Sequence, residues 1–186
     1  MRSFKKLVVL AVVFALSAIG AASASAAQFT ASSTGELSGR GSLSHTFKFT
    51  GGNVSCLTTK INGTIAKTAS TEQHVTVNYS GCTAFGFASV HITPATYNLT
   101  ASGTYHITNT ITMTVTGAGC SITIGPQSRG SVVYSSLPGG YLQANFYVSG
   151  LSYTSTGGLC GSSGLGFYDG WTESHRVGGG SLSYDF

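Results

Sequence analysis

Residues 108–125, TNTITMTVTGAGCSITIG, decide the fold. Apolar side chains alternate with threonine or serine on both sides of a glycine-containing break at 117–119. Alternation with a period of two is typical of a strand with one buried face. A short glycine-containing break between two such runs predicts a β-hairpin. We therefore expect a hairpin whose threonines face solvent and whose Cys120 faces the core.

The same pattern recurs in both directions from this hairpin. We expect strands over residues 28–34, 44–50, 54–66, 71–79, 84–93, 97–107, 131–135, 141–149, 151–154, 167–176 and 181–186. The segment 97–107 is either one strand or a pair divided near Gly103. Residues 35–42 and the glycine-rich segment 157–166 are expected to be loops, and Ser80-Gly81 is expected to end a strand. Asn62-Gly63 fits either a hairpin turn or a continuous strand. This pattern predicts an all-β, antiparallel β-sandwich of about ten to twelve short strands, with barrel-like closure as a variant.

The first 26 residues have the features of a secretory signal peptide. Basic residues precede an apolar run at 7–19, and small-x-small cleavage sites follow it. The apolar run is short for a bilayer span. We expect cleavage after export, which leaves residues 27–186 as a single extracellular or cell-surface domain. No later segment is apolar enough for a membrane helix.

The cysteine pattern indicates an oxidising compartment. Cys56, Cys82, Cys120 and Cys160 are an even set in an exported chain, which predicts two disulfides. Three pairings are possible. We favour Cys56–Cys82 and Cys120–Cys160, because each closes a moderate loop between neighbouring strands. A four-cysteine zinc site is disfavoured, because the chain has no C-x-x-C pair.

Charge patterning argues against a nucleic-acid partner. The formal net charge is +4, but three of the nine basic residues lie in the predicted signal peptide. The remaining domain is therefore almost neutral. It has no cluster of lysine and arginine that could hold nucleic acid or an anionic membrane by charge.

Three segments carry a resemblance to known proteins. Residues 72–87 (EQHVTVNYSGCTAFGF), 114–127 (TVTGAGCSITIGPQ) and 177–186 (VGGGSLSYDF) resemble a family of small exported bacterial proteins of unknown function. The resemblance covers nearly the whole mature chain, and its most specific marks are the Gly-Cys strand starts. It implies secretion and an all-β domain. It supplies no activity, ligand or catalytic residue.

The chemically densest stretch is residues 168–176, YDGWTESHR, which contains the only tryptophan. One interpretation is a ligand platform in which Trp171 and Tyr168 stack on a sugar and Asp169 bonds its hydroxyls, with Glu173 and His175 nearby. The other is an ordinary exposed strand face, with Trp171 turned into the core. Asp169 and Glu173 would lie about 13 Å apart on a strand. Paired glycosidase carboxylates are about 5–9.5 Å apart.

The sequence contains no nucleophile elbow, phosphate-binding loop, zinc-protease motif or EF-hand. We therefore expect no cofactor, no metal and no enzymatic activity. The favoured function is a structural or binding module of the cell envelope, with a cell-wall or extracellular polysaccharide as its partner. One alternative is an outer-membrane β-barrel, because residues 182–186 alternate up to a C-terminal aromatic. Another is a small secreted hydrolase that uses Asp169, Glu173 and His175.

Overall fold

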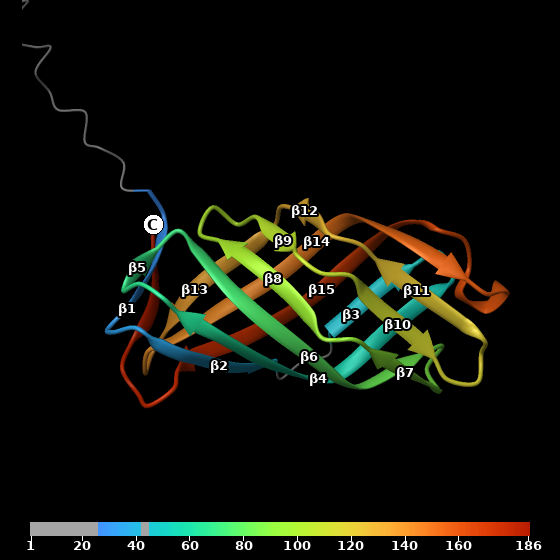
Figure 1. Cartoon of the computed structure of the whole chain (residues 1–186), viewed down its shortest axis with the longest axis horizontal. Helices are drawn as coiled ribbons and strands as arrows, with labels where there is room; N and C mark the ends of the chain where they lie inside the picture. The colour runs from blue at the N-terminus through green and yellow to red at the C-terminus, as the bar shows by residue number, and fades with distance from the viewer. Residues whose placement is uncertain (1–25, 42–44) are drawn as a thin grey trace, which may run out of the picture.

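Strands make up most of the computed structural model, which describes residues 26–41 and 45–186 (Figure 1). The strands are β1 (Gln28–Ala31), β2 (Gly35–Gly41), β3 (His45–Phe49), β4 (Gly52–Ile65), β5 (Ala69–Ser70), β6 (Glu72–Ala84), β7 (Ala88–Ile92), β8 (Ala95–Thr100), β9 (Tyr105–Ile107), β10 (Ile111–Val115), β11 (Cys120–Ile124), β12 (Gln127–Arg129), β13 (Val132–Leu137), β14 (Tyr141–Thr156), β15 (Gly164–Arg176) and β16 (Leu182–Asp185). A 3-10 turn, η1 (Gly158–Cys160), precedes β15. The predicted all-β, antiparallel fold class is confirmed.

Two sheets contain these strands. The larger follows the order β12-β9-β8-β6-β7-β10-β11-β14-β15-β2-β4-β3, with β13 paired to β14. Further pairings of β6 with β4 and of β15 with β3 bend it back on itself, so that it encloses one elongated apolar core (Figure 1). The smaller sheet, β16-β1-β5, lies at the end of the molecule where the chain finishes.

The central hairpin forms as its alternation predicts. Val115 pairs with Cys120 across the turn between β10 and β11. The six apolar positions of the two strands are buried, with exposed fractions of 0–4%: Ile111, Met113, Val115, Cys120, Ile122 and Ile124. β10 also pairs with β7 and β11 pairs with β14, so the hairpin lies within the larger sheet and not at its edge.

The loop predicted at 35–42 is wrong, because residues 35–41 form β2 between β4 and β15. Its glycines allow neighbouring strands to approach closely. A β-carbon at Gly39 would overlap the carbonyl oxygen of Glu173, and one at Gly41 would overlap the His45 ring. The glycines that suggest a loop in the sequence are thus packing positions of a strand.

Two strands run further than their sequence breaks suggest. Asn62-Gly63 lies inside continuous β4, where Gly63 pairs with Val75. β6 continues through Ser80-Gly81, where Gly81 adopts a φ of 62° and lies beside the Leu57 side chain of β4. By contrast, β7 begins only at Ala88, so residues 85–87 of the predicted 84–93 strand form a turn.

The preferred disulfide pairing is confirmed. Cys56 is bonded to Cys82 across β4 and β6, and Cys120 at the start of β11 is bonded to Cys160 in η1. Residues 1–25 of the predicted signal peptide lie outside the described residues. Within the described part of the chain, no helix has the length and apolar character needed to cross a membrane.

Candidate functional site

Strand β15 divides the predicted ligand platform between its two faces. Asp169, Trp171, Glu173 and His175 point outward and are half-buried. Tyr168 points into the core and is 2% exposed. The structure therefore brings four of the five predicted residues together on one surface and places Tyr168 beneath it. Trp171 does not turn into the core.

The pairing of β15 with β14 extends this outer face. Tyr147 lies opposite Asp169, Asn145 opposite Trp171 and Gln143 opposite Glu173. Tyr147 is 59% exposed. Amide, carboxylate and aromatic side chains therefore alternate along a two-stranded ribbon. We call this surface, residues 141–147 and 169–175 on their outward faces, the ribbon face.

A groove of about 470 Å³ opens at one end of the ribbon face. β15 contributes Glu173 and His175 to its lining, β14 contributes Tyr141, and β2 contributes Arg40. Arg40 is the strand neighbour of Glu173. The Tyr141 and His175 rings lie 5.2 Å apart, tilted by 49°. The groove thus offers aromatic surface together with cationic and anionic hydrogen-bonding groups.

Two groove residues, Arg40 and Tyr141, are absent from the sequence-based prediction. Tyr141 had a usable signal, because it opens an alternating strand directly after the Pro138-Gly139-Gly140 turn. Arg40 had none, because its segment has the composition of a loop. Only the pairing of β2 with β15 places it beside Glu173.

Beneath the ribbon face lies a buried network of polar side chains. The Tyr97 and Tyr79 hydroxyls are 2.8 Å apart, and the Tyr79 hydroxyl donates to the Tyr168 hydroxyl over 3.3 Å. The Tyr168 hydroxyl lies 2.7 Å from His45 Nδ1, and His45 Nε2 lies 3.1 Å from Thr59 Oγ1. The network connects β8, β6, β15, β3 and β4 through the core.

One arrangement of protons satisfies the whole network. Because Tyr79 donates to Tyr168, Tyr97 donates to Tyr79 and Tyr168 donates to His45 Nδ1. His45 then carries its proton on Nε2, the tautomer that can donate to Thr59. Burial lowers the pKa of His45 to about 4 and raises the pKa of Tyr168 well above its usual value. Both groups are therefore neutral at pH 7.

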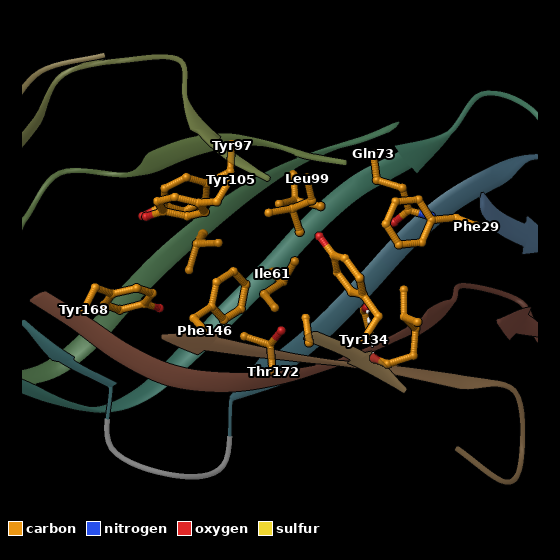
Figure 2. Close-up of a pocket in the computed structure, with 15 residues that line it drawn as sticks. Phe29, Ile61, Gln73, Tyr97, Leu99, Tyr105, Tyr134, Phe146, Tyr168 and Thr172 are labelled. Carbon is orange, nitrogen blue, oxygen red and sulfur yellow. Dashed lines mark hydrogen bonds between the residues drawn. The ribbon is translucent and has the colours of Figure 1, made fainter. Parts of the chain in front are cut away.

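The core contains a small cavity of about 20 Å³ (Figure 2). Figure 2 shows Tyr97, Tyr105 and Tyr168 toward one side of it and Phe29, Gln73 and Tyr134 toward the other. The buried Tyr134 hydroxyl has no hydrogen-bond partner among the described residues. This volume holds about one water molecule. A larger ligand does not fit in the core, so the groove and the ribbon face are the candidate site.

Within residues 26–41 and 45–186, no three histidine, cysteine or acidic side chains gather closely enough to hold a metal ion. No protein-family model, curated protein or solved structure matches the chain. The site is therefore interpreted from its own chemistry.

Proposed function

We propose that this protein is an exported, non-enzymatic module that binds polysaccharide along the ribbon face. The observation that carries the proposal is the position of Trp171, half-buried between Asp169 and Glu173 on the outer face of β15. An indole offers a broad apolar surface, and the flanking carboxylates accept hydrogen bonds. Sugar rings present the matching pair of surfaces, namely apolar C–H faces and hydroxyl edges.

The extent of the surface favours a polymer over a single sugar. From Asp169 to His175 the strand rises roughly 20 Å. Tyr147 opposite Asp169 and Tyr141 beside His175 add aromatic surface at the two ends. A chain of sugars lying along β15 would therefore meet an aromatic ring at its start, middle and end.

The carboxylate spacing supports binding over hydrolysis. Asp169 and Glu173 share a face but are four residues apart, which corresponds to about 13 Å along a strand. Retaining and inverting glycosidases use carboxyl groups roughly 5–9.5 Å apart. Two disulfides and a predicted signal peptide are consistent with action outside the cell.

Sedimentation with insoluble polysaccharides tests the proposal. The mature chain is mixed with cellulose, chitin or isolated wall polysaccharide of the producing cells, and the bound fraction is measured for wild type and Trp171→Ala. Leu57→Ala is the matched control, because Leu57 is 69% exposed on β4 and lies outside the ribbon face. We expect binding to at least one polymer, with a roughly tenfold loss for Trp171→Ala alone. Equal binding by all three proteins would refute the site.

A further inference from the structure

Four turns meet at the end of the molecule opposite the C-terminus (Figure 1). They are residues 50–51 between β3 and β4, 85–87 between β6 and β7, 116–119 between β10 and β11, and 157–163 between β14 and β15. A β-carbon at Gly51 would overlap the Cys160 carbonyl group, so two of these turns are in direct contact. The disulfide at Cys160 fixes one of these turns to β11.

The side chains at these turn tips are apolar and exposed. Phe87 is 83% exposed, Leu159 64% and Phe85 39%. Together with residues 116–118 they line a groove of about 460 Å³. We call Phe85, Phe87 and Leu159 the apolar end. Exposed apolar groups that cluster in this way mark an interaction surface.

The backbone at Phe85 supports a selected role for this surface. Phe85 has a φ of 56°, in the left-handed region that bulky residues seldom adopt. This conformation costs energy in a phenylalanine, and glycine at this position would remove the cost. The following residue, Gly86, also has a positive φ and is a glycine. Local strain of this kind concentrates at functional positions. At this turn it keeps a large aromatic ring at the surface.

The apolar end carries no charge. None of the four turns contains Asp, Glu, Lys, Arg or His. Glu36, Glu72 and Asp185 lie at the start of β2, the start of β6 and the end of β16, toward the opposite end of the molecule. Lys48 on β3 stacks on the Phe167 ring, 5.3 Å from its centroid. The four turns are thus uncharged, whereas these three carboxylates lie toward the end that holds the C-terminus.

We propose that the apolar end inserts into the lipid–water interface of a membrane. Phenyl and leucyl groups on projecting turns suit a deformable apolar layer, in which apolar groups enter the boundary between headgroups and acyl chains. A carboxylate or ammonium group would have to be desolvated there, and the four turns contain neither. Because charge plays no part, neutral lipid suffices. The ribbon face is on other residues, so this inference stands independently of polysaccharide binding.

Vesicle sedimentation tests the proposal on the mature chain. Phosphatidylcholine vesicles are mixed with wild type, with the double variant Phe87→Ser/Leu159→Ser, and with Val133→Ser as the control. Val133 is 60% exposed on β13, so this control removes an exposed apolar side chain away from the turns. We expect wild type and Val133→Ser to sediment with vesicles. The affinity of the double variant for vesicles should be lower by roughly tenfold or more. Binding should persist at about 1 M salt.

Three outcomes would overturn the proposal: no vesicle binding by wild type, equal binding by the double variant, or binding that high salt abolishes. Sedimentation velocity without lipid tests the alternative that the apolar end binds a second copy of the chain. Wild type that does not bind vesicles but self-associates, together with a monomeric double variant, would show that the apolar end joins two copies of the chain. The lipid proposal would then be wrong.

Discussion

The Tyr168 hydroxyl lies 2.7 Å from His45 Nδ1, a contact between residues 123 positions apart in the chain. It connects β15 to β3 directly beneath the ribbon face. Trp171 and Tyr168 lie on opposite faces of the same strand, so the buried bond holds the strand that presents the indole. The proposed binding surface therefore depends on a neutral polar network in the core.

Replacing Tyr168 with phenylalanine removes that bond and keeps the ring. His45 Nδ1 then loses its donor in a buried site, which costs about 1–3 kcal/mol. Urea unfolding should show this loss of stability. The matched control is Tyr147→Phe, since Tyr147 is 59% exposed, and it should be nearly neutral. Equal stability of the two variants would show that the bond contributes nothing.

Stability should depend on the protonation of His45. Its pKa is lowered to about 4 in the folded protein by burial, whereas an unfolded histidine titrates near about 6.5. Between these values the unfolded state binds more protons, so stability falls as pH falls from about 6.5 to about 4. The shift corresponds to about 3 kcal/mol, all of it present above pH 6.5.

Chemical unfolding across this pH range checks the prediction. His45→Gln removes the titrating group and keeps hydrogen-bonding capacity, so its stability should change less over the same window. A wild-type slope that His45→Gln retains in full would assign the pH dependence to another group.

Replacing Gly170 with alanine should destabilise the folded protein. A β-carbon there would overlap the His45 ring, which is itself fully buried. Overpacking of a core position typically costs about 1–3 kcal/mol. Gly125→Ala is the control, because a β-carbon at Gly125 meets open space. In thermal unfolding, the midpoint temperature of Gly170→Ala should lie well below that of Gly125→Ala. Equal midpoint temperatures would disprove the close contact.

Each disulfide should contribute to stability separately. Intact-mass measurement before and after reduction should show two bridges, as a mass difference of about four hydrogens between the oxidised and the reduced chain. The double variants Cys56→Ser/Cys82→Ser and Cys120→Ser/Cys160→Ser should each lose about 2–4 kcal/mol. Four free thiols in the exported protein would contradict the pairing.

Local alternation made much of the fold predictable. The hairpin of β10 and β11 follows from period-two patterning alone, and the turn fixes its register at Val115 and Cys120. β2 could not be found in this way. Positions 39 and 41 require glycine because neighbouring strands leave no room for a β-carbon there. The local sequence pattern contains no information about those neighbours. Gly81 is another case, because β6 pairs with β4 in unbroken register on both sides of a residue that usually ends a strand.

The candidate site was predictable only in part. Asp169, Trp171, Glu173 and His175 are spaced by two, so strand alternation alone puts them on one face. The same parity separates Tyr168 from Trp171, a consequence that the stacking hypothesis overlooked. Arg40 enters the groove through the pairing of β2 with β15, and its position required the tertiary structure.

The most direct test of polysaccharide binding uses Trp171 as its own probe. It is the only tryptophan in the chain, so intrinsic fluorescence reports on this one position. The mature protein is titrated with soluble oligosaccharides cut from whichever polymer it sediments with. We predict a saturable change in tryptophan emission that Tyr147→Ala weakens and that Leu57→Ala leaves intact. Sedimentation with the polymer but no change in emission would contradict the ribbon face as the binding site.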